Sequence, residues 1–359
     1  MTGFSFETTP RILCEDGAAL KLAEFLNGMG VTRPFIVTDA GLVSAGVVQP
    51  ILDALKAARV TATMFSEVLA DPPEASVMAA VTAAREAGAD GVVGLGGGSS
   101  LDTAKLVALL AGTDQVLPDI YGIGLARGPR LPLVQIPTTA GTGSEVTNIA
   151  IVTTPDDQKK GVVSPLLYPD AAILDAALTT GLPPRVTAMT GVDAMVHAIE
   201  AYTSKHKKNP VSDSLAVAAL KLLHGNIRRV IADGADLPAR RAMLQGSLLA
   251  GMAFANAPVA AVHALAYPIG GIFHAPHGLS NALVLGPVLR FNLPAAAFVD
   301  EIAALTAAMP MEQRLSELGV EVQHLDRLAH DAMQVQRLLI NNPREVTLAD
   351  ARALYEEAL

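Results

Sequence analysis

Along the first half of the chain, short apolar runs alternate with longer stretches whose apolar residues recur at helical spacing. The strands expected from the apolar runs cover residues 34–38, 61–65, 91–95 and 133–136. The helices expected between them include residues 76–88 and 99–112. Alternation of strand and helix predicts a parallel sheet with helices on both faces.

The pattern changes after Leu182, where two prolines precede long helical stretches rich in Ala, Leu and Met. No clear strand pattern follows. The expected helices cover residues 186–202, 213–232, 239–254, 295–308 and 325–338. We therefore predict two domains, an α/β domain over residues 1–181 and an all-helical domain over residues 182–359.

The most unusual segment is residues 242–289, which contains no Asp, Glu, Lys or Arg. It is long enough to span a bilayer. However, His263, His274 and His277, together with several Pro and Gly residues, argue against a membrane helix. We expect two buried helices joined by a turn, forming part of a water-poor site in which the imidazoles need partners.

Composition narrows the function classes. The net charge of −9 disfavours nucleic acid or an anionic membrane as a partner, because both require cationic patches. Cys14 is the single cysteine, so disulfides within the chain and cysteine zinc sites are excluded. The N-terminal residues have no basic segment followed by an apolar one, so a cytoplasmic protein without a signal peptide is expected.

The first motif is GGGSSLDTAK at residues 96–105, directly after a predicted strand. Glycines let the backbone approach a ligand closely, and the start of the following helix favours a phosphate. Ser99 and Asp102 have the spacing of a capping box, which is the ordinary structural alternative. The motif does not match GxGxxG, so the usual dinucleotide fingerprint is absent.

The second motif is PTTAGTGSEVT at residues 137–147, which carries five hydroxyls and two glycines after another predicted strand. Two such loops at the ends of successive strands suit a dinucleotide, although a plain polar loop is the alternative. Asp39, also at a strand end, fits a ribose diol and would repel a 2′-phosphate, which favours NAD over NADP. Asp39 as a simple turn residue is the competing interpretation.

The third pattern is a set of metal-binding residue types. Asp193 and His197 are four residues apart, so they share one face of a helix, although this spacing is also common without a ligand. His263 and His277 lie in the uncharged segment, and His274 competes for the role of His277. One carboxylate and three imidazoles suit Fe²⁺ or Zn²⁺.

Together these motifs resemble the iron-containing (group III) alcohol dehydrogenase family. The similar segments are GGGSSLDTAK (96–105), PTTAGTGSEVT (137–147), TGVDAMVHAIEAYTS (190–204), HALAYPIGG (263–271), HAPHGLSNA (274–282) and NNPREVT (341–347). The resemblance implies a dehydroquinate synthase-like architecture, with an N-terminal α/β nucleotide-binding domain and a C-terminal helical metal-binding domain. It also implies a homodimer or larger assembly.

By this resemblance the metal ligands are Asp193, His197, His263 and His277. The implied contacts to the nicotinamide cofactor, to which we add Asp102 of the first motif, are Asp39, Gly97, Gly98, Ser99, Thr138, Thr139, Thr142, Lys160 and Leu178. The chain departs from the family at two positions. Tyr267 replaces a histidine near the substrate, and Asp71 replaces an asparagine near the cofactor.

The expected activity is NAD-dependent interconversion of a primary alcohol and its aldehyde, with Fe²⁺ or Zn²⁺ as Lewis acid. Tyr267 or His274 is expected to pass the proton outward. The alternatives are a maleylacetate reductase and a metal-dependent lyase of the same fold. Both call for cationic side chains at the site, and residues 242–289 supply none, so a small apolar pocket is expected.

Overall fold

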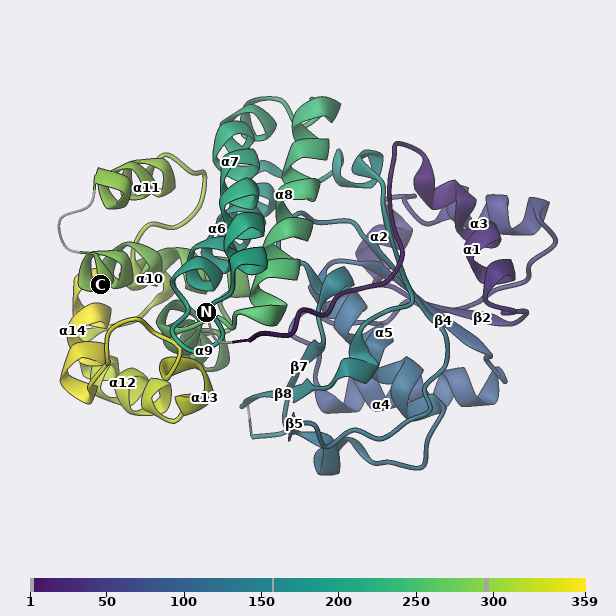
Figure 1. Ribbon diagram of the computed structural model, residues 1–359, viewed down its shortest axis with the longest axis horizontal. Helices are drawn as coiled ribbons and strands as arrows, with labels where there is room; N and C mark the ends of the chain where they lie inside the picture. Colours follow the sequence, from purple (N-terminus) through teal and green to yellow (C-terminus); the bar gives the residue numbers. More distant parts are fainter. Residues whose placement is uncertain (1–2, 157, 294–296) are drawn as a thin grey trace. The chain divides into compact units, whose positions relative to one another are not determined.

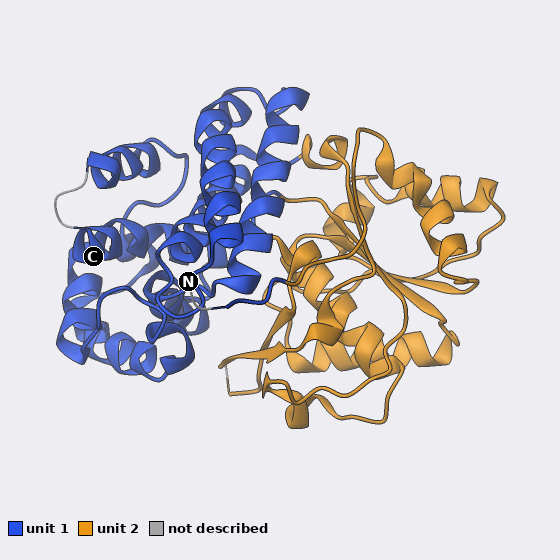
Figure 2. Ribbon diagram, in the orientation of Figure 1, with its two compact units in different colours: residues 1–6, 140–142, 182–359 blue, residues 7–139, 143–181 orange. Residues whose placement is uncertain are grey.

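The computed structural model describes residues 3–156, 158–293 and 297–359, which form two compact units (Figure 2). The sheet unit comprises Glu7–Thr139 and Gly143–Gly181. The helical unit comprises Leu182–Leu359, the short segment Ala140–Thr142 and the described residues up to Phe6. Part of the second motif therefore belongs to the helical unit, although the chain on both sides of it belongs to the sheet unit.

The sheet unit is built on a six-stranded, fully parallel sheet (Figure 1). Its strand order is β1 (Ile12–Cys14), β9 (Ala171–Leu174), β6 (Leu133–Pro137), β4 (Gly91–Gly96), β2 (Pro34–Val37) and β3 (Thr63–Phe65). The four inner strands are buried along their whole length, as expected of a parallel sheet covered on both faces. The predicted α/β class and the parallel sheet are confirmed.

Alternate residues of the inner strands enter two separate cores, because successive side chains of a strand point to opposite faces. On one face Ile36 and Val93 pack with α1 (Leu22–Gly28) and α3 (Gln49–Ala57). On the other face the packing elements are α4 (Glu74–Glu86) and α5 (Gly98–Ala111). The short helix α2 (Ala40–Ser44) follows β2.

Several strands were not predicted from the sequence pattern. Edge strand β1 has only three residues and β9 is half alanine, so neither forms a strong β-branched run. A second sheet of three strands was also missed. It has the order β5 (Gly122–Ile123), β8 (Lys159–Val163) and β7 (Ile149–Thr153).

The described part of the helical unit contains α-helices and 3-10 turns and no strand. Its helices are α6 (Pro184–Thr203), α7 (Pro210–Ala232), α8 (Leu237–Asn256), α9 (Ala261–Phe273), α10 (His277–Asn292), α11 (Ala297–Ala307), α12 (Leu325–Met333), α13 (Gln336–Leu339) and α14 (Leu348–Ala358). Several of these helices have a proline at their first or second position, and several have a side-chain cap at the N-terminus. Asn209 caps α7 and Asp236 caps α8.

Two sequence expectations for this unit are wrong in detail. Residues 242–289 form the end of α8, all of α9 and most of α10, which is three helices rather than two. Pro258 disfavours a helical backbone at the residue before it, which is consistent with the end of α8 at Asn256. The helix expected at 325–338 breaks between α12 and α13. The expected helix start at 295–296 lies outside the described residues.

Helix α9 is tied to the last helix of the chain. Tyr355 of α14 is fully buried, and its hydroxyl donates to the Leu265 carbonyl of α9 at 2.6 Å. Pro268 interrupts the regular hydrogen bonding of α9 one turn after His263.

Within the described ranges no single helix combines the length and the hydropathy of a membrane span; α8 and α9 pass that test only as a pair, across a bend of 104°.

Candidate metal centre and nucleotide-binding loops

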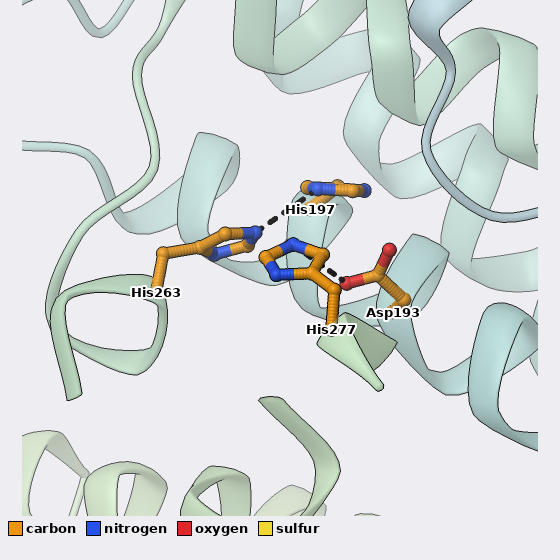
Figure 3. A group of neighbouring side chains, drawn as sticks. All are labelled: Asp193, His197, His263 and His277. Carbon is orange, nitrogen blue, oxygen red and sulfur yellow. Dashed lines mark hydrogen bonds and ion pairs between the residues drawn. The ribbon is translucent and has the colours of Figure 1, made fainter. Parts of the chain in front are cut away.

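The structure brings together the four side chains that the sequence selects as metal ligands (Figure 3). Asp193 and His197 lie one turn apart on α6, His263 lies in the first turn of α9, and His277 is the first residue of α10. One ligand atom from each lies within 4.8 Å of the others. Three of the side chains are buried, whereas that of His277 is 37% exposed and leaves the group accessible from one side.

Hydrogen bonds to the outer ring nitrogens orient two of the imidazoles. His197 Nδ1 lies 3.2 Å from the Gly141 carbonyl oxygen, and His263 Nδ1 lies 2.6 Å from Glu200 Oε2. Both oxygens are acceptors, so each Nδ1 carries the proton and each Nε2 presents a lone pair. The two Nε2 atoms are 3.1 Å apart. Two facing lone pairs at this distance are stabilised by a cation between them, which fits a metal ion.

Glu200 is part of this arrangement, although sequence reasoning gave it no role. It is buried, and its second oxygen Oε1 accepts from the Val262 N–H at 2.7 Å. One carboxylate therefore fixes both the imidazole of His263 and the backbone at the start of α9. A carboxylate behind a metal-binding histidine is a common second layer of such sites. Its position three residues after His197, on the same helix face, was the available signal.

Asn281 is the second residue that sequence reasoning missed. Its Nδ2 donates to Asp193 Oδ1 at 2.6 Å and lies 3.2 Å from Nε2 of both His263 and His277. Its Oδ1 is buried and has no hydrogen-bond partner among the described residues. Asn281 therefore lies among the ligand atoms, one helical turn after His277.

The protonation states of the group also favour a cation. Burial alone would raise the pKa of Asp193, but the positive charge that a neighbouring imidazole carries when it is protonated, together with the Asn281 amide, outweighs burial and holds that pKa below its ordinary value. Burial lowers the pKa of His197 to about 3. The set therefore offers an ionised carboxylate and a neutral imidazole, the forms that bind Fe²⁺ or Zn²⁺.

Two glycines allow the close backbone approaches behind the ligands. A Cβ on Gly278 would lie 2.5 Å from the Met189 carbonyl oxygen, so α10 begins in direct contact with α6. A Cβ on Gly141 would lie 2.8 Å from Cβ of Thr190, also on α6. Gly141 is the residue whose carbonyl orients His197, so this contact sets the position of that carbonyl.

The two proposed proton carriers occupy different surroundings. The Tyr267 ring lies next to the metal group, with its centroid 6.3 Å from that of His277. His274 ends α9 with a left-handed backbone (φ 53°) and is exposed. It does not belong to the group of four ligand atoms.

In the sheet unit, six of the predicted cofactor residues lie at the carboxyl ends of the neighbouring strands β2, β4 and β6: Asp39, Gly97, Gly98, Ser99, Thr138 and Thr139. Gly97 caps α5 and Gly98 begins it, directly after β4. Thr138 follows β6, and a Cβ on Gly97 would lie 3.5 Å from Cγ2 of Thr139. The two loops are therefore adjacent. Asp39 ends the turn after β2, where its Oδ1 caps α2 by accepting from the Leu42 N–H at 3.0 Å.

The carboxylate of Asp102 forms hydrogen bonds within the sheet unit, so its partners are protein groups. Its carboxylate accepts from Ser144 Oγ at 2.6 Å and from the Ile151 N–H at 2.9 Å. The capping box, which was the structural alternative for Ser99 and Asp102, is therefore not formed, because α5 starts at Gly98 and has no side-chain cap. Ser99 instead accepts from the Asp71 N–H at 3.2 Å.

The remaining predicted cofactor residues are less concentrated. Lys160 is exposed on β8, with Nζ 5.7 Å from the centroid of the Tyr121 ring. Leu178 packs against the core from a 3-10 turn, and Thr142 belongs to the helical unit. Asp71, the departure noted above, forms an ion pair with Lys159 at 2.9 Å.

Comparisons with known proteins agree with these observations. The iron-containing alcohol dehydrogenase family model matches residues 9–176, and the C-terminal model of that family matches residues 187–298 and 293–359. The chain is 39% identical over 370 residues to long-chain-alcohol dehydrogenase 1 of Geobacillus thermodenitrificans (strain NG80-2), covering 95% of this chain and 93% of the relative.

Two solved structures are also similar. A 1,3-propanediol oxidoreductase is 32% identical with a TM-score of 0.95, over 99% of this chain and 100% of that one. A sulfoacetaldehyde reductase from Bifidobacterium kashiwanohense, in complex with NAD⁺, is 29% identical with a TM-score of 0.91, over 100% and 99%. The resemblance found in the motifs is confirmed. The chain belongs to the iron-containing alcohol dehydrogenase family.

Proposed function

We propose that this protein is an NAD-dependent oxidoreductase that interconverts a primary alcohol and its aldehyde with the help of a divalent metal ion. The observation that carries the proposal is the convergence of Asp193, His197, His263 and His277, with two of the imidazoles held in the ligand tautomer. Family membership and the NAD⁺ complex of a similar enzyme support the same activity.

The metal would be held by the four converging side chains, and Fe²⁺ and Zn²⁺ both suit this donor set. Such an ion supplies Lewis acidity toward a substrate oxygen, and NAD accepts or returns the hydride. The chain's own contribution is to prepare the ligands. Glu200 and the Gly141 carbonyl orient His263 and His197, and the Asn281 amide holds Asp193.

The ligand helices also limit the access of water. Asp193, His197 and His263 are at most 4% exposed, so these three ligand side chains are shielded from water. A water-poor surrounding strengthens electrostatic interactions with bound groups. Tyr267 and His274 are the proposed proton carriers, with Tyr267 nearer the ligands and the exposed His274 nearer solvent.

The cofactor is proposed to bind over the glycine start of α5 and the adjacent threonine loop. The helix start offers free N–H groups to a phosphate, and Asp39 offers a carboxylate to a ribose diol. The proposed contacts are Asp39, Gly97, Gly98, Ser99, Asp102, Thr138, Thr139, Thr142, Lys160 and Leu178. A homodimer or larger assembly and a cytoplasmic location remain predictions from the sequence.

The test is NADH formation with a panel of primary alcohols after reconstitution with Fe²⁺ or Zn²⁺. We expect His263→Ala to lose metal and activity together, because it removes a buried ligand. His330→Ala, which changes an exposed histidine of α12, is the matched control and keeps both. Full activity of a metal-free His263→Ala protein would refute the proposal.

A further inference from the structure

Arg337 contacts Tyr267, the tyrosine beside the four candidate metal ligands, and so places a positive charge near that ligand group. It lies on α13, far in the chain from the uncharged segment, and it is half-buried. Its Nη2 donates to the Tyr267 hydroxyl at 3.2 Å, and its guanidinium carbon lies 5.8 Å from the centroid of the tyrosine ring. Because Tyr267 is next to His277, the expectation of a purely apolar pocket missed this cation.

The guanidinium has few acceptors of its own. Among the residues that the structure describes, no Asp or Glu forms an ion pair with Arg337, whereas Arg185, Arg290 and Arg352 each pair with a carboxylate. The two buried carboxylates at the ligand group have other partners, Glu200 in His263 and Asp193 in the ligand group itself. An arginine has five N–H donors in a planar fork, which suits an oxyanion.

Tyr267 also favours binding of an oxyanion. Its hydroxyl oxygen accepts from Arg337, so its own hydrogen is available to donate to a second group on that side. A phenol and a guanidinium together offer several donors and only the phenol oxygen as an acceptor. Such a pair favours a ligand group that only accepts, as an ionised carboxylate or sulfonate does.

We infer that Arg337, together with Tyr267, recognises a negatively charged end group on the substrate, so that the preferred substrates are hydroxy acids and their aldehydes with a terminal carboxylate or sulfonate. The inference rests on the proposed function. In the reaction, hydride passes from the carbinol carbon to NAD⁺, the hydroxyl proton is released, and the products are the aldehyde, NADH and H⁺. The anionic group is unchanged and serves only for recognition.

The kinetic test compares matched substrate pairs with the metal-reconstituted enzyme. One pair is 4-hydroxybutanoate and 1-butanol, and the other is 2-hydroxyethanesulfonate and ethanol, so the two arms separate carboxylate from sulfonate. We expect the ratio of kcat/KM for the anionic to the uncharged alcohol to exceed one in at least one pair. Arg337→Met should lower that ratio roughly 10- to 100-fold, which is the loss of a hydrogen bond to a charged group. Arg337→Lys should give an intermediate ratio.

Arg327→Met is the matched control, because it removes the same charge from an exposed position on α12. It should leave the ratio unchanged. A wild-type ratio of one or less in both pairs, or a ratio that Arg337→Met does not lower, would overturn the inference. Circular dichroism of each variant establishes that it is folded, and Tyr267→Phe, which keeps the ring and removes only the hydroxyl, should lower the ratio by a smaller factor.

A binding experiment separates this inference from the proposed activity. Butanoate and ethanesulfonate are titrated into the purified protein, and binding is followed by ligand-observed NMR with 1-butanol as the uncharged probe. We expect the anions to bind more tightly than 1-butanol in the wild type, and to lose this advantage in Arg337→Met. Anion binding with no turnover of any alcohol would refute the proposed function and support the anion site; equal anion binding by wild type and Arg337→Met would refute the anion site whatever the turnover.

Discussion

Glu200→Gln tests whether a residue that need not touch the metal determines how well the protein holds it. Both carboxylate oxygens of Glu200 accept a hydrogen bond, one from His263 Nδ1 at 2.6 Å and one from the Val262 N–H at 2.7 Å. A glutamine has only one oxygen. Its NH₂ group must therefore face one of the two N–H donors, or else His263 must move its proton to Nε2.

The size of the effect follows from these two contacts. If the amide opposes the Val262 N–H, one charge-assisted hydrogen bond is lost, at a cost of about 1.5–3 kcal/mol. If the His263 proton moves to Nε2 instead, the lone pair that would bind the metal is lost. The first case corresponds to a metal affinity lower by roughly 10- to 100-fold, and the second case lowers it further.

The assay is competition for Zn²⁺ or Fe²⁺ between the protein and a coloured chelator, which requires no turnover. Glu301→Gln is the control, because Glu301 is an exposed glutamate of α11 that pairs with His224. We expect the control to bind metal as the wild type does. A folded Glu200→Gln protein with wild-type metal affinity would refute the reasoning, because His263 would then not depend on Glu200 for its tautomer.

Three further predictions concern other parts of the molecule. Gly278→Ala places a methyl group on the Met189 carbonyl, so we expect the start of α10 to shift and metal affinity to fall at least tenfold, as measured by chelator competition. Asp39→Ala removes the carboxylate proposed to exclude a 2′-phosphate, so the kcat/KM ratio for NAD⁺ over NADP⁺ should fall; an unchanged ratio would show that Asp39 only caps α2. Burial raises the pKa of Glu145 to about 7, so the folded state holds this proton more tightly than the unfolded state. Its contribution to the free energy of unfolding is therefore lost as pH rises, by about 2 kcal/mol between pH 5 and pH 7, and urea titration of Glu145→Gln should show that much less pH dependence.

The sequence predicted the inner layers of the fold well, for identifiable reasons. Strands β2 and β4 are continuous apolar runs, and β6 is apolar except for Gln135. Such runs are typical of strands that are buried on both faces of a sheet. Strands β1 and β9 complete the same sheet, but they are too short or too rich in alanine to stand out. The pairing of β1 with β9 joins residues more than a hundred positions apart, which no local pattern contains.

Some residues of the candidate site could likewise be predicted from local sequence, whereas others could not. Asp193 and His197 were found because helical spacing is local, and His263 and His277 because imidazoles in an uncharged segment are conspicuous. Glu200 and Arg337 were not predicted, because their contacts with His263 and Tyr267 join different helices. Arg337 is 70 residues from Tyr267 in the chain, and only the folded helical unit places them together.

The hydrogen bond from Tyr355 to α9 has a consequence for the order of events in the cell. Synthesis proceeds from the N-terminus, so all four ligand positions leave the ribosome before α14 does. Until then, the Leu265 carbonyl of α9 lacks its donor, the Tyr355 hydroxyl, and the helix carrying His263 has fewer contacts. We therefore expect metal uptake to follow completion of the helical unit, and a ribosome-bound chain without α14 to take up less metal than the full chain.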